Sequence, residues 1–197
     1  ENTPRDWHKE IDNLTHLYIM EIIKYADGAS SRPLEKWPII NSATVFNGGV
    51  VKIAPGGVDG ADATSDPIYG ICKGFVADGG STPLENALPG QFDGTLVDGV
   101  SYTASADNET DKKVQALVEP ILPNDTIRAE MDATLGTTTG SNKVGYYVDV
   151  LTTDERKLDE SNTSTSQLQF IIVGQPGKGK FVDVKLVENQ INGAVQA

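Results

Sequence analysis

Residues 167–187, QLQFIIVGQPGKGKFVDVKLV, decide the fold of this chain. On each side of the glycine-rich centre, apolar residues alternate with other residues. The residues that share a face are Leu168, Phe170 and Ile172 before the centre, and Val182, Val184 and Leu186 after it. Alternation with a period of two is typical of strands that bury one face. The short glycine-rich connection therefore predicts an antiparallel hairpin.

The chain upstream of the hairpin consists of short apolar segments separated by glycine-rich turns. The chain contains 20 glycines and 10 prolines, which fits many turns better than long helices. Candidate strands are 44–46, 50–54, 68–76, 100–103, 114–119, 125–131 and 144–151. This spacing is typical of an antiparallel β-sandwich or β-barrel. We predict a β domain over residues 37–197, with a long loop excursion at about 77–111.

The N-terminal region follows a different pattern. Over residues 4–26, apolar side chains recur every three or four positions, which predicts an amphipathic helix. The main stripe consists of Trp7, Ile11, Leu14, Tyr18 and Ile22. With a proline-bearing linker after it, this helix forms a predicted arm over residues 1–36. We expect the stripe to contact another subunit or a partner, and docking on its own β domain is the alternative.

The charge of the chain restricts its partners. The formal net charge is −12, and such an acidic surface repels phosphate backbones, so we expect no nucleic-acid partner. No apolar stretch approaches the ~20 residues that span a bilayer, so we expect no membrane partner either. Cys72, the single cysteine, cannot form an intramolecular disulfide, and its apolar surroundings predict a small buried side chain.

Residues 174–181 imitate a phosphate-binding loop, because they match the spacing G-x-x-x-x-G-K. However, Phe181 stands where that loop needs Ser or Thr, and the alternation after it predicts a strand instead of a helix. We therefore expect a basic hairpin tip and no bound nucleotide. The two histidines, His8 and His16, would lie about 12 Å apart along a helix and could not share a metal ion.

Two loops are rich in acidic residues. These are Asp59, Asp62 and Asp66, and then Asp107, Glu109 and Asp111. Neither group has the ordered spacing of a calcium-binding EF-hand loop, so we expect solvated loop acids, with calcium binding left open. No nucleophile–base pair is visible either. The sequence thus predicts no catalytic residues, no metal site and no cofactor, and a protein that is not an enzyme.

Five segments, taken in order, resemble one known family. They are GGVVKI at 48–53, IYGICKGF at 68–75, the segments QALVEP and DTIRAE within 115–130, RKLDESNT at 156–163, and the terminal hairpin with its continuation to residue 190. Together they resemble the capsid decoration (cement) proteins of tailed bacteriophages. The chain departs from the family in two places. At the C-terminal end of the similar region, KLVE at 185–188 replaces a basic-Ile-Asn pattern, and the predicted N-terminal helix has no counterpart in the family.

The resemblance implies a structural virion protein. Members of this family bind the outer surface of the capsid at junctions of the major capsid protein, often as homotrimers, and they perform no catalysis. Two alternatives stay open. The chain could be another head–tail structural protein. It could also be a carbohydrate-binding β-sandwich used for host adhesion, with Tyr102, Tyr146 or Tyr147 stacked on sugars; packing of these tyrosines inside the sandwich is the competing interpretation.

Overall fold

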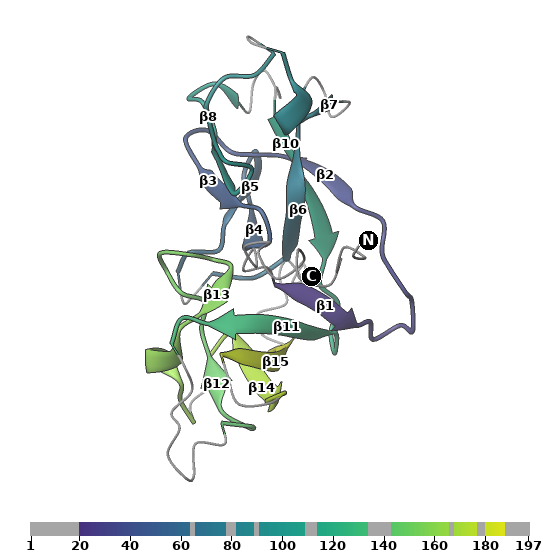
Figure 1. Ribbon diagram of the computed structural model, residues 1–197, viewed down its shortest axis with the longest axis vertical. Coiled ribbons are helices and arrows are strands. Elements are labelled where there is room, and N and C mark those ends of the chain that lie inside the picture. The colour runs from purple at the N-terminus through teal and green to yellow at the C-terminus, as the bar shows by residue number, and fades with distance from the viewer. Residues whose placement is uncertain are drawn as a thin grey trace, which may run out of the picture.

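The computed structural model describes residues 20–63, 66–77, 82–88, 91–108, 114–133, 143–165, 168–176 and 180–187. In these residues the chain forms three mostly antiparallel sheets (Figure 1). The two 3₁₀ helices with described bounds are short: η3 (Leu84–Asn86) and η4 (Glu160–Asn162). The prediction of a mainly β fold with antiparallel sheets is confirmed. The described strands do not close into a barrel.

Sheet A has the strand order β1–β11–β15–β14–β12, with β13 pairing in parallel to β11. Its strands are β1 (Glu21–Lys24), β11 (Thr126–Met131), β12 (Tyr147–Val148), β13 (Lys157–Leu158), β14 (Phe170–Gly174) and β15 (Phe181–Leu186). The predicted hairpin is β14 with β15. Phe170 lies opposite Leu186, and Ile172 lies opposite Val184, so the alternating apolar residues share the buried face as expected.

Sheet B has the order β2–β10–β6–β4–β5, with β7 pairing to β6. Its strands are β2 (Glu35–Pro38), β4 (Val50–Ala54), β5 (Gly57–Gly60), β6 (Gly70–Ala77), β7 (Thr82–Pro83) and β10 (Val114–Pro120). Sheet C contains β3 (Thr44–Phe46), β8 (Thr95–Val97) and β9 (Ser101–Thr103). The predicted loop excursion at 77–111 thus holds β7, η3, β8 and β9.

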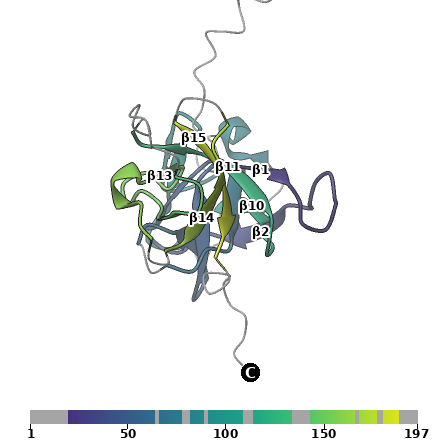
Figure 2. The ribbon, with the colours of Figure 1, turned by 90° about the horizontal axis from the view of Figure 1, so that it is seen from below.

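Sheet B is shared by two hydrophobic cores. Val51 and Cys72 belong to the core that sheet B forms with sheet C, which also contains Tyr102. The preceding residues, Val50 and Ile71, belong to the core that includes sheet A. Neighbouring residues enter different cores because successive side chains of a strand point to opposite faces. Sheet A accordingly lies at one end of sheet B, with β11 running across the direction of β6 (Figure 1), and β11, β14 and β15 cross the middle of the view from below (Figure 2).

The helix predicted at residues 4–26 is wrong over residues 20–26, where the chain forms β1. This strand pairs with β11, so that Ile22 lies opposite Ile127. Ile22 is 5% exposed and belongs to the core, whereas Ile23 is 40% exposed. Adjacent β-branched residues favour a strand, and the edge of β11 supplies its hydrogen-bond partners. Residues 4–19, including Trp7, Ile11, Leu14 and Tyr18, lie outside the described residues.

The predicted boundary at residue 36 does not separate an arm from the β body. β1 belongs to sheet A, and β2, which was predicted to be a linker, pairs with β10 of sheet B. The chain from residue 20 to 38 therefore connects the two large sheets. Its middle part, residues 25–34, lies between the two strands and carries the polar contacts described next.

Candidate functional site

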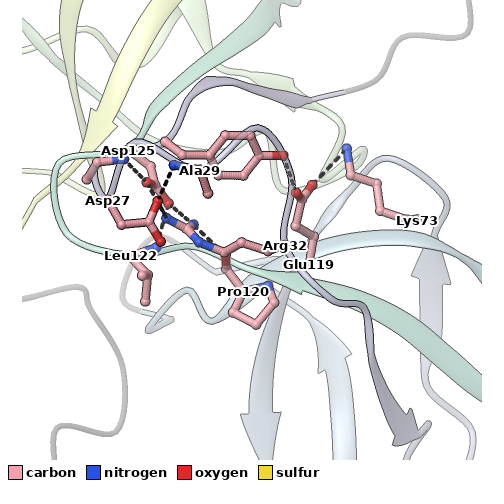
Figure 3. A network of polar contacts seen from close by, with 10 residues as sticks. Asp27, Ala29, Arg32, Lys73, Glu119, Pro120, Leu122 and Asp125 are labelled. Atoms are coloured by element: carbon pink, nitrogen blue, oxygen red, sulfur yellow. Dashed lines mark hydrogen bonds and ion pairs between the residues drawn. The ribbon is translucent and has the colours of Figure 1, made fainter.

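A buried ion pair fastens the β1–β2 connection to the β10–β11 connection (Figure 3). Arg32 donates to Asp125 through both terminal nitrogens, with Nη2 at 2.8 Å from Oδ1, and Nη1 also donates to the Pro120 carbonyl at 3.1 Å. The side chains of Arg32 and Asp125 are 7% and 0% exposed. Two-pronged contact of this kind fixes geometry as well as charge. We refer to Tyr25, Arg32, Glu119 and Asp125 as the inter-sheet latch.

Asp125 has its hydrogen-bonding capacity filled. Besides Arg32, the backbone N–H groups of Ala26 and Leu122 donate to its carboxylate at 2.8 and 2.7 Å. Burial raises the pKa of this carboxyl, but the bonds from Arg32, Ala26 and Leu122 outweigh burial and leave the pKa below its usual value. Asp125 is therefore a charged structural group, held by donors from the β1–β2 connection and from its own β10–β11 connection.

The second half of the latch joins Tyr25, the residue after β1, to sheet B. The Tyr25 hydroxyl donates to Glu119 Oε1, and Lys73 Nζ lies 3.4 Å from Glu119 Oε2. The Arg32 guanidinium lies 4.9 Å from the centre of the Tyr25 ring, within the range of a cation–π contact. The bond to Glu119, with burial, raises the pKa of Tyr25 to about 12. The phenol thus stays protonated and acts as a hydrogen-bond donor between the sheets.

The acidic residues Asp59, Asp62 and Asp66 surround the ammonium group of one lysine, Lys52. Lys52 Nζ lies 2.8 Å from Asp66, 3.4 Å from Asp62 and 3.6 Å from Asp59. An ammonium thus takes the place that a bound cation would need. Within the ranges that the structure describes, no group of three or more His, Cys, Asp or Glu residues is arranged to hold a metal ion. Of the second acidic group, Glu109 and Asp111 lie outside these ranges.

The predicted strand after the P-loop-like sequence is present, because β15 begins at Phe181, directly after Lys180. The three tyrosines proposed to stack on sugars differ in exposure. Tyr102 is fully buried between Phe75 and Phe92, with ring centres 5.9 and 6.3 Å away, so it packs in the core. Tyr146 and Tyr147 are partly exposed, and Lys143 Nζ lies 4.9 Å from the Tyr146 ring centre.

A surface aromatic pair was not singled out by the sequence. Trp37 and Tyr69 meet edge to face with ring centres 5.7 Å apart. Both donate to the Glu35 carboxylate, the indole Nε1 at 2.9 Å. The two aromatics are 32 positions apart in the chain, and only the fold brings them together. Both rings are partly exposed beside the core between sheets B and C.

Cys72 should be unreactive in the folded protein. The residue is fully buried, and burial raises the pKa of its thiol to about 12. Because the thiolate is the reactive form, an aromatic disulfide reagent at pH 8 should label native protein far more slowly than protein in denaturant. Rapid labelling under native conditions would contradict this placement of the thiol.

Comparison with known proteins found no match to a family model, a curated protein or a solved structure. None of the helices in the described part of the chain has the length and apolar character needed to cross a bilayer.

Proposed function

We propose that this chain is a structural virion protein that decorates a bacteriophage capsid. It would bind the outer surface at junctions of the major capsid protein, as a homo-oligomer and most simply as a trimer. One observation supports the proposal. The five segments that resemble decoration proteins fall on β4, β6, β10–β11, β13–η4 and β14–β15, so their order in the sequence follows the strands of one β body.

The architecture fits a protein that resists separation of its neighbours. Sheet B contributes to both cores, and the latch ties the two large sheets through buried charges. A ligand that binds only the mature shell stabilises that shell by mass action. An oligomer that engages several capsid subunits at once adds avidity. A rigid body transmits such binding across a junction better than a flexible one.

The copy number per particle tests the proposal. In purified virions that contain this chain, quantitative mass spectrometry against the major capsid protein should give a ratio set by the capsid lattice. A few copies per particle would favour a tail or connector protein instead. Absence from the particles would overturn the proposal.

We expect residues 1–18 to contribute to attachment. The chain enters the described body at Met20, beside β1, which is an edge strand of sheet A with Ile23 exposed. Deleting 1–18 removes Trp7, Ile11, Leu14 and Tyr18 and keeps all of β1. The truncated protein should melt cooperatively but bind particles at least ~10-fold more weakly, since burying each large apolar side chain is worth roughly 1.5–3 kcal/mol. Unchanged particle binding would remove these residues from the interface.

A carbohydrate-binding function is the second candidate, and the Trp37–Tyr69 pair favours it. A partly exposed aromatic pair beside the Glu35 carboxylate offers a ring face and a hydrogen-bond acceptor to a sugar. Glycan-array binding that Trp37→Ala and Tyr69→Phe weaken would support this function, with Tyr146→Ala as the comparison at the other partly exposed aromatic site. Absence of binding to any glycan would exclude it for the tested sugars.

A further inference from the structure

Glu155 is a buried carboxyl at the contact between sheets A and B. It lies in the turn 151–157, which connects the region of β12 to β13 of sheet A, and it is 6% exposed. The turn is closed by its own backbone bonds, Asp154 N to Leu151 O at 3.1 Å and Leu151 N to Lys157 O at 2.9 Å. Val50 of β4, in sheet B, donates its N–H to the Glu155 carbonyl at 3.1 Å.

Gly60 of sheet B makes room for the end of the Glu155 side chain, and Gly49 lies beside its Cβ. A Cβ placed on Gly60 of β5 would lie 2.7 Å from Glu155 Oε1, closer than real atoms approach. A Cβ on Gly49, which precedes β4, would lie 3.4 Å from Glu155 Cβ. The carboxyl therefore sits directly on the backbone of the β4–β5 hairpin. A side chain at residue 60 would displace the end of the Glu155 side chain from this position.

The charged groups around Glu155 do not neutralise it. Asp154 in its own turn, and Asp59 and Asp62 from β5 and the chain after it, add negative charge. The basic side chains packed nearby form ion pairs with other carboxylates. Lys52 of β4 contacts Asp59, Asp62 and Asp66, while Arg156 and Lys157 contact Asp154. Glu155 Oε2 is buried with no hydrogen-bond partner.

We propose that the contact between sheets A and B depends on the protonation state of Glu155. In its neutral form Glu155 holds the turn 151–157 against the β4–β5 hairpin, and its ionisation loosens this contact. An unpaired carboxylate in a buried, acidic position is costly, whereas a carboxylic acid is tolerated there. Burial, with the neighbouring aspartates, raises the pKa of Glu155 to about 7. The change of state thus falls near neutral pH.

The direction of the pH effect follows from this shift. The folded protein holds the Glu155 proton up to about pH 7, whereas the unfolded chain releases it near 4.5. Stability from the neutral carboxyl is therefore complete below pH ~4.5 and is lost as the pH rises through 7. Titration of Asp125 acts in the opposite direction and at acidic pH, because its folded pKa is lowered. The two effects therefore occupy different pH windows.

The direct test is a carbon-13 NMR titration of the Glu155 carboxyl in the wild-type protein, which needs no variant. Its midpoint should lie near pH 7. The second measurement is amide hydrogen exchange at Val50 and Leu151 in wild type and in Glu155→Gln. Comparing the two proteins at each pH cancels the intrinsic pH dependence of exchange and the titration of groups that do not interact with Glu155.

Between pH 6 and 8, the protection factors of these two amides in wild type should fall by up to ~10-fold relative to Glu155→Gln, because a folded pKa of about 7 allows about one pKa unit of linkage over this range. Glu85→Gln, which removes an exposed glutamate in η3, should behave as wild type. A carboxyl midpoint near 4.5, or a constant ratio of protection factors, would overturn the proposal. Protection restored at pH 8 by millimolar calcium in wild type alone would also overturn it, because the site would then hold a cation and not a proton.

Discussion

Replacing Arg32 with methionine should lower the free energy of unfolding by about 3–5 kcal/mol, measured by urea denaturation at pH 7. Asp125 is fully buried, so loss of the guanidinium leaves a carboxylate without its charge partner in the protein interior. The backbone donors Ala26 and Leu122 remain, but they do not cancel a full negative charge. The cost comes mainly from this uncompensated charge and less from the lost bonds themselves.

Two companion variants make the prediction specific. Arg128→Met breaks a pair with Asp183 that lies at the surface, where the arginine side chain is 43% exposed, and should cost less than about 1 kcal/mol. Adding Asp125→Asn to Arg32→Met removes the buried charge and should recover a large part of the loss. If Arg32→Met lowered the unfolding free energy as little as Arg128→Met does, the latch would not stabilise the contact between the sheets.

Acidic pH should shrink the effect of Arg32→Met. In wild type the pKa of Asp125 is lowered, so the stability from its ionised form is present above the unfolded pKa and is lost as the pH falls through the folded pKa. In Arg32→Met, protonation of Asp125 removes an uncompensated buried charge and therefore stabilises the folded state. Without Arg32, burial raises the pKa of Asp125 in the folded variant, so the difference in unfolding free energy between the two proteins should begin to narrow above pH ~4, the usual pKa of aspartate, and should continue to narrow as the pH falls further.

The sequence predicted the strands whose burial pattern is local. β3 and β4 have the predicted bounds, and the β14–β15 hairpin follows from alternation of side chains within seven residues on each side. β5 could not be found in this way. Its sequence, GVDG, reads as part of a turn, and it forms a strand because β4 pairs with it and its backbone comes close to Glu155. Tertiary contact overrides local propensity at such a position.

The polar residues at the contacts between sheets were missed for the same reason. Arg32 and Asp125 are 93 positions apart in the chain, and Tyr25 and Glu119 are 94 apart. Neither pair has a spacing that a sequence pattern could reveal, and each residue taken alone resembles an ordinary surface group. The fold brings them together because β1 and β2 flank the segment that carries Tyr25 and Arg32. Only the topology identifies these charges as buried.

Replacing Ile22 with aspartate should destabilise the protein by more than about 4 kcal/mol, or prevent folding, whereas Ile23→Asp should cost only about 1 kcal/mol. The two residues are neighbours of identical chemistry, but β1 turns Ile22 into the core and leaves Ile23 at the surface.

The same variants test whether the N-terminal region contributes to the stability of the β body. Because β1 is hydrogen-bonded to β11 and Met20 and Ile22 lie in the core, deleting residues 1–28 should abolish the cooperative thermal transition of the β body. Ile22→Asp should reproduce much of that loss with a single substitution, and circular dichroism melts of the three proteins provide the measurement. If the deletion and Ile22→Asp both melted like wild type, β1 would be dispensable to the fold and residue 22 would be free to serve an interface. If they unfold while Ile23→Asp does not, any attachment to a partner must be made by residues before Met20 or by the outer surfaces of the sheets.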